Sequence, residues 1–228
     1  LTSVDSAQKA VRVLRQQPID VLIVDVDTAD LDGWRLSRLV RSGILHCRAD
    51  MPIIITAHTW CERIAEVTDP VAEGRRIDLP WLGVALTVLE VPGHTRSHIA
   101  WYGGDALFCG DTLFAAGCGR LFEGTAEQMW HSLSRIASLP LHTRIHCAHE
   151  YTEANFKFLS SVDAGVLSVY DEVKKARAAG RGTVPSTIGQ ELKNNLFMQC
   201  NDERVQKLVG VSTAVDAMEK LREMKNAF

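Results

Sequence analysis

The sequence has 228 residues, of which 46% are hydrophobic and 23% are charged, and its formal net charge is −3. This size and composition predict one globular domain or two small ones with a buried core. The slight negative charge and the lack of Lys/Arg runs exclude a polyanion-binding surface, so we expect no nucleic-acid partner. No apolar stretch approaches the roughly 18 residues of a membrane span, so we expect no membrane partner.

The cysteines are scattered along the chain without CxxC spacing, which is typical of reduced thiols rather than a disulfide framework. We therefore expect a cytoplasmic protein. The chain opens on Leu1 rather than Met, which indicates a processed, trimmed or partial polypeptide. The six cysteines are Cys47, Cys61, Cys109, Cys118, Cys147 and Cys200.

The first 66 residues alternate between helical and strand patterns. Helical spacing of apolar residues begins at Ala7, and Pro18 ends the predicted helix. The continuous apolar run at 20–25 predicts a strand buried on both faces, and 52–57 repeats that pattern after a second predicted helix. This βα alternation predicts parallel strands joined by a crossover helix.

Two stretches in this region, DVLIVDVDTADLDG and MPIIITA, resemble the middle of a response-regulator receiver domain, which has a flavodoxin-like fold. The resemblance makes Asp25 the phospho-acceptor and Thr56 the switch residue. The acidic pair that binds Mg²⁺ in receivers and their late lysine have no counterpart here. Because little would neutralise a transferring phosphoryl group, we expect Asp25 to be vestigial.

Residues 83–90 alternate between apolar and polar positions, as a half-buried strand does. The segments 98–102 and 106–109 predict a hairpin that turns at 103–105. Thr125 with Gln128 predicts a capping box at the start of a helix. A short strand is expected at 144–147.

From residue 152 onward the sequence is mainly helical. We expect one helix capped by Thr152, another over 166–179, and a short helix after Thr187. A further helix is expected near Asp202, and Ser212 is expected to cap the last helix.

His94, Asp111 and His149 each lie where a strand pattern gives way to a Gly-flanked or polar loop. Imidazoles and a carboxylate on such rigid supports are the donors that a hydrolytic metal centre uses. The motifs PGHT, GDTLF, GCGRLFEGT and HEYT occur in this order and surround these residues. Together they resemble the hydroxyacylglutathione hydrolases (glyoxalase II) of the metallo-β-lactamase superfamily over about residues 69–228.

The resemblance implies hydrolysis of S-D-lactoylglutathione, a glutathione thioester, to glutathione and D-lactate at a centre of two metal ions. The family carries out this step in methylglyoxal detoxification. Asp111 then matches the catalytic carboxylate that bridges the ions, His94 a ligand of one ion, and His149 a ligand of the other. The implied metal is zinc, iron or manganese.

The implied fold is an α/β metallo-β-lactamase-like αββα half-sandwich with a C-terminal helical extension, preceded by the receiver-like βα fragment. The expected boundaries are 1–66 for the fragment, 67–160 for the half-sandwich and 161–228 for the glutathione-binding extension. Arg120, Tyr151, Arg222 and Lys225 match the family's glutathione contacts, since cations and a phenol suit a peptide with two carboxylates. Phe122 stands where some members have tyrosine.

The family's main metal motif, Thr-His-x-His-x-Asp-His, has no counterpart upstream of His94. We therefore expect hydrolysis to be impaired or lost. In an alternative alignment, VLIVDVDTAD is the family's own early strand and ITAHTWCE takes the place of the motif, with His58 one position out of register. The alternative function is a hybrid or chimeric protein with a receiver-derived signalling or interaction module and no catalysis.

Overall fold

The computed structural model describes residues 7–19, 22–25, 36, 39–40, 42, 45, 53–56, 71–80 and 83–228. The chain divides into two compact units. One unit comprises Leu1–Pro70 with Leu79–Val84, and the other comprises Val71–Asp78 with Ala85–Phe228.

The first unit contains helix α1 (Ala7–Gln16) and strands β1 (Leu22–Asp25) and β2 (Ile53–Thr56). The two strands pair in parallel, from Leu22 opposite Ile53 to Asp25 opposite Thr56. The predicted parallel pair is therefore confirmed. Apolar residues spaced as one helical face of α1 are buried in a small core with residues further along the chain. That core consists of Ala10, Leu14, Leu36, Val40 and Leu45.

The second unit is built on a six-stranded sheet in the order β10-β9-β6-β5-β4-β3. Strands β4, β5 and β6 are antiparallel neighbours, whereas β6 and β9 are parallel. The predicted hairpin is confirmed, and its two turn residues Gly104 and Asp105 both have positive φ, which suits a tight turn between twisted strands. The strands are β3 (Arg76–Leu79), β4 (Val84–Glu90), β5 (Ile99–Gly103), β6 (Ala106–Gly110), β9 (Arg144–Cys147) and β10 (Ser186–Thr187).

Parallel pairing of β6 with β9 requires a long crossover, and helix α3 (Ala126–Ala137) lies within it. Its predicted capping box is present, because the Thr125 side chain accepts from the Gln128 N–H and the Gln128 side chain accepts from the Thr125 N–H. The crossover also contains a small hairpin of β7 (Leu113–Phe114) and β8 (Gly117–Cys118).

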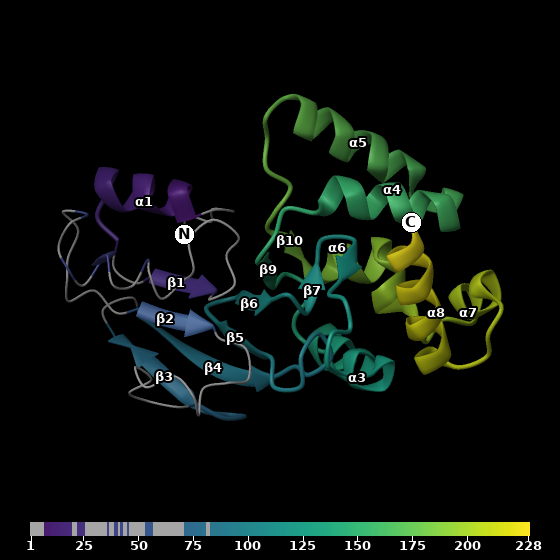
Figure 1. Cartoon of the computed structure of the whole chain (residues 1–228), viewed down its shortest axis with the longest axis horizontal. Helices are drawn as coiled ribbons and strands as arrows, with labels where there is room; N and C mark the ends of the chain where they lie inside the picture. The colour runs from purple at the N-terminus through teal and green to yellow at the C-terminus, as the bar shows by residue number, and fades with distance from the viewer. Residues whose placement is uncertain are drawn as a thin grey trace. The chain divides into compact units, whose positions relative to one another are not determined.

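Helices make up most of the chain after residue 151. Figure 1 shows α4 and α5 running side by side, with α7 beside α8 near the C-terminus. Their bounds are α4 (Thr152–Val162), α5 (Leu167–Ala178), α6 (Ile188–Asn194), α7 (Glu203–Val209) and α8 (Ala214–Ala227), with 3-10 turns η3 (Ala164–Val166) and η4 (Leu196–Gln199). No described helix is both long and apolar enough to traverse a bilayer.

Two predicted caps are wrong. Thr152 is the first residue of α4 rather than its cap, and its hydroxyl donates to Glu150 Oε1 at 2.6 Å. The last helix is capped by Thr213 rather than Ser212, since the Thr213 hydroxyl accepts from the Asp216 N–H. At the last helix a neighbouring threonine supplies the cap, whereas α4 begins after Tyr151, which makes no side-chain cap hydrogen bond.

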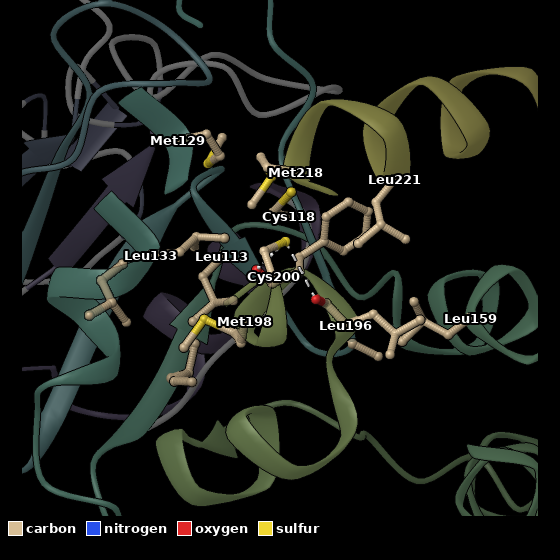
Figure 2. Packing of buried hydrophobic residues seen from close by; sticks show 14 of the residues in the cluster. Leu113, Cys118, Met129, Leu133, Leu159, Leu196, Met198, Cys200, Met218 and Leu221 are labelled. Atoms are coloured by element: carbon tan, nitrogen blue, oxygen red, sulfur yellow. Dashed lines mark hydrogen bonds between the residues drawn. The ribbon is translucent and has the colours of Figure 1, made fainter. Parts of the chain in front are cut away.

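One hydrophobic core joins the β7–β8 hairpin to the helices. Figure 2 shows Leu113 and Cys118 of the hairpin among side chains of α3, α8 and the η4 turn. Residues 85–228 thus pack as one compact unit. The predicted boundary at residue 160, between the half-sandwich and the glutathione-binding extension, stays a prediction.

Candidate functional site

His94 lies in the loop after β4, at a position set by the Pro92–Gly93 turn. Gly93 has φ +144°, and a Cβ there would come within 2.7 Å of the Met129 Cα. Only glycine allows the loop to approach α3 so closely. The His94 side chain is consequently held in place and is 8% exposed.

Asp111 and His149 meet because of the sheet topology. Asp111 directly follows β6, and His149 follows β9 by two residues. Because β6 and β9 are parallel neighbours, their carboxyl ends lie at the same edge of the sheet. The Ala148 N–H donates to the Gly110 carbonyl at 3.1 Å and fixes the two loops against each other.

The carboxylate of Asp111 lies between the two imidazoles. Its Oδ2 is 3.5 Å from His94 Nε2, and its Oδ1 is 3.4 Å from His149 Nε2. Oδ1 is buried and accepts no hydrogen bond from the residues that the structure describes. The structure therefore brings together all three residues that the motifs predicted as metal ligands.

Backbone contacts orient these side chains. His94 Nδ1 donates to the Arg120 carbonyl at 2.6 Å, which makes Nε2 the ring nitrogen that faces Asp111. The Asp111 N–H donates to His98 Nε2 at 3.1 Å. His98 thus supports the Asp111 backbone.

Burial of Asp111 favours its neutral form and by itself raises its pKa. The hydrogen bond with His94 and the charges of His149, His94 and His98 outweigh burial, so that the pKa of Asp111 lies below its usual value. The group is ionised at neutral pH, as a metal-binding carboxylate must be.

The donor chemistry fits metal binding as two pairs, each with one imidazole nitrogen and one carboxylate oxygen. Among the described residues, no three His, Cys, Asp or Glu side chains form a complete single-ion group. Catalytic zinc usually takes three ligands from protein. His58 and Cys61, which lie in the stretch ITAHTWCE, are outside the described residues.

Aromatic rings surround the ligand cluster. The exposed Tyr151 ring stacks on His149 with 4.8 Å between ring centroids, and Phe114 meets Tyr151 edge-on at 5.3 Å. Phe122 is 68% exposed and its ring lies 4.9 Å from that of His94. The cluster therefore has apolar walls on the sides of both histidines.

The predicted substrate-binding cations lie in different environments. Arg120 is exposed, whereas Arg222 is 4% exposed and donates to the Cys118 carbonyl at 2.9 Å. The guanidinium of Arg222 is used in packing, and its predicted contact with glutathione stays a prediction. Lys225 donates to Asn155 Oδ1 at 2.6 Å.

Lys225 is less basic than an ordinary lysine. Burial, followed by repulsion from Arg222 and Arg120, lowers the pKa of Lys225 to about 8, although Cys118 acts in the opposite direction. Three cations close enough to affect one another make a local positive region that suits an anionic ligand.

Asp25 and Thr56 end two paired strands, opposite each other in register. The description of these two residues extends only to their backbone, so the proposed phospho-acceptor role stays a prediction. The sequence did not indicate Phe114, Asn155 or Glu191, whose contacts with the site join segments far apart in the chain.

Two family models match the chain. Residues 42–149 match the model described as the metallo-beta-lactamase superfamily, and residues 150–228 match the hydroxyacylglutathione hydrolase C-terminus. The first match begins inside the segment predicted to be receiver-like. The receiver interpretation of residues 1–66 gains no support from these matches and stays a prediction.

Curated relatives carry the name hydroxyacylglutathione hydrolase. One from Methylobacillus flagellatus is 43% identical over 164 residues, covering 70% of this chain and 66% of the relative. One from Methylococcus capsulatus is 36% identical over 223 residues, covering 89% of this chain and 85% of the relative. The chain thus spans slightly less than two thirds of the first relative's length and most of the second's.

A solved structure shares the fold. The crystal structure of ETHE1 from Myxococcus xanthus aligns with 97% of this chain and 76% of its own, with a TM-score of 0.55 and 19% identity. Together with the superfamily match, this alignment confirms the predicted metallo-β-lactamase-like α/β fold.

Proposed function

This chain belongs to the hydroxyacylglutathione hydrolase family of the metallo-beta-lactamase superfamily, and from this membership we propose that it hydrolyses glutathione thioesters such as S-D-lactoylglutathione. The observation that carries the proposal is the Asp111 carboxylate, which is 13% exposed and has one imidazole beside each of its oxygens. This arrangement supports a centre of two ions.

In this proposal His94 and Asp111 would hold one ion, and His149 and Asp111 would hold the other. The superfamily implies a metal, and zinc, iron and manganese are the ions we propose. When bound, such ions supply an activated water and stabilise negative charge on the thioester carbonyl oxygen. The hydrogen bond from His94 Nδ1 to the Arg120 carbonyl keeps the other ring nitrogen available as a ligand.

The chain's own cations suit the substrate's charge. Glutathione carries two carboxylates, and Arg120 and Lys225 offer an exposed guanidinium and a half-buried ammonium for them. Arg222 donates to the Cys118 carbonyl and adds positive charge near Lys225, which supports a role in attracting an anionic substrate. The exposed phenol of Tyr151 lies beside His149, where it can meet the substrate near the metal ligands.

Two further expectations concern impaired hydrolysis and a cytoplasmic location. The expected impairment depends on the sequence around ITAHTWCE, and the comparisons do not support impairment or a chimera. The cytoplasmic location is also a proposal, supported by four free thiols among the described residues, Cys109, Cys118, Cys147 and Cys200.

Metal-dependent turnover tests the proposed function. Purified protein is assayed with S-D-lactoylglutathione before and after chelation, and again after Zn²⁺, Fe²⁺ or Mn²⁺ is added. We expect about two ions per chain and hydrolysis that chelation removes, at a rate below that of a relative with the complete Thr-His-x-His-x-Asp-His motif. Metal-loaded protein that leaves the thioester intact would contradict the proposal.

A pH dependence should follow from Lys225. Its protonated form attracts a substrate carboxylate, so KM should be lowest below about pH 8 and should rise as pH passes the lowered pKa. KM measured from about pH 6.5 to about pH 9.5 checks this. Lys225→Arg keeps its charge across this range and should remove the rise, whereas an unchanged rise in that variant would assign it to another group.

A further inference from the structure

The β7–β8 hairpin, residues Leu113–Cys118, lies between two parts of the candidate site. Asp111 precedes it by two residues, and Arg120, whose carbonyl holds His94, follows it by two. The Gly119 N–H donates to the Thr112 carbonyl at 3.2 Å and closes the base of the hairpin. Any movement of this hairpin therefore acts on both sides of the ligand cluster.

Side chains from the C-terminal helices hold the hairpin backbone. Asn195 Nδ2 donates to the Gly117 carbonyl at 3.1 Å, and Glu191 Oε2 accepts from the Ala116 N–H at 2.8 Å. Ala116 has φ +60°, a conformation that costs energy for a residue with a Cβ. A buried carboxylate bonded to this N–H maintains the strained turn.

Asn155 of α4 makes the contact that joins the hairpin to the substrate-binding region. Its Nδ2 donates to the Ala115 carbonyl at 2.8 Å, and its Oδ1 accepts from Lys225 Nζ at 2.6 Å. The side chain is 3% exposed, and a Cβ on Gly117 would lie 2.7 Å from Nδ2. Both ends of one buried amide are thus engaged, with little room for another rotamer.

The hairpin residue next to this contact reaches the ligand cluster. Phe114 lies 6.1 Å from the His149 ring and 5.3 Å from the Tyr151 ring, between ring centroids. Asn155 therefore connects the ammonium proposed to hold a substrate carboxylate with the wall beside a proposed metal ligand.

We infer that Asn155 is a positioning residue that fixes the distance between the carboxylate-binding Lys225 and the reacting centre beside His149. This inference rests on the proposed function for the roles of Lys225 and His149. A thioester anchored at one end reacts well only when its carbonyl reaches the centre in the correct place, and small misplacements reduce the rate steeply.

A double-mutant cycle tests the inference. Asn155→Leu keeps the volume and removes both hydrogen bonds, so we expect kcat to fall about tenfold and KM to rise. Lys225→Met should raise KM about tenfold with kcat within about twofold of the original. The double variant should have the KM of Lys225→Met and the kcat of Asn155→Leu.

That non-additive pattern distinguishes positioning from general destabilisation. Asn201→Leu, at an exposed asparagine before α7, is the matched control and should leave both constants unchanged. If Asn155→Leu only lowers the amount of folded protein, or if its effect on KM adds fully to that of Lys225→Met, the inference is wrong.

Amide hydrogen exchange gives a readout that does not need catalysis. Asn155→Leu should reduce protection at Ala116 and Gly119 about tenfold or more, while Lys225→Met and Asn201→Leu should not. Should Asn155→Leu fail to fold, Asn155→Asp keeps the bond from Lys225 and loses the donor to Ala115, so it should show the same loss of protection. If the native chain cleaves no thioester, the proposed function fails, and these exchange data alone decide whether Asn155 holds the hairpin.

Discussion

Replacement of Asp111 by asparagine should remove bound metal and lower kcat/KM for the thioester by about a hundredfold or more, since a metal centre supplies several kcal/mol of transition-state stabilisation. Both oxygens of the carboxylate face an imidazole nitrogen, at 3.5 Å and 3.4 Å. Asparagine keeps one neutral oxygen and presents an NH₂ group in place of the other. One of the two donor pairs is thereby lost, together with the negative charge.

Metal content per chain and steady-state kinetics measure this effect. Asp105→Asn is the matched control, because Asp105 is an exposed turn residue with φ +58° whose carboxylate pairs with His142 on the surface. Asparagine tolerates this left-handed conformation well, so the control should retain its metal and its turnover. Metal content that is unchanged in Asp111→Asn would show that the ions are held elsewhere.

Much of the second unit could be predicted because local signals agree with tertiary packing. The alternation at 83–90, the two-residue turn at Gly104 and Asp105, and the Thr125 capping box each specify structure within a few residues. The strands β7, β8 and β10 have only two residues each, too few for any periodic pattern. Their pairing depends on long-range contacts instead.

The residues of the candidate site also fall into two groups, those that a short motif predicts and those that only long-range contacts reveal. The three proposed ligands could be located because each follows a strand within a short motif, and the sheet topology then brings them together. Asn155 and Glu191 could not, since their hairpin partners Ala115 and Ala116 lie 40 and 75 residues away in the chain. A buried asparagine or glutamate carries no local sign of the backbone group that it binds.

In the N-terminal region, a correct prediction of the strand pairing does not decide which family the segment comes from. The parallel pairing of β1 and β2 is confirmed. A parallel βα pair is compatible with a receiver fragment and with the alternative that VLIVDVDTAD is the hydrolase family's own early strand. The superfamily match that begins at residue 42 includes β2 and favours the second interpretation.

Gly119→Ala should disrupt the candidate site while leaving its charged and ligating side chains in the sequence. A Cβ on Gly119 would lie 2.0 Å from the Asp111 carbonyl oxygen and 3.0 Å from His94 Nδ1. The backbone must shift at both ligands, and displacements of this kind reduce activity by about a hundredfold. We expect metal content and turnover to fall together, with unfolding at a lower temperature.

Gly182→Ala provides the comparison, since the nearest atom to a Cβ there is the Val184 carbonyl oxygen at 3.7 Å. This variant should keep its metal and activity, and its stability should be unchanged or slightly higher because alanine reduces the freedom of the unfolded chain. Metal analysis, kinetics and thermal unfolding of the two variants decide the matter. If Gly119→Ala binds metal and turns over as the native protein does, the close approach of Gly119 to Asp111 and His94 does not shape the working site.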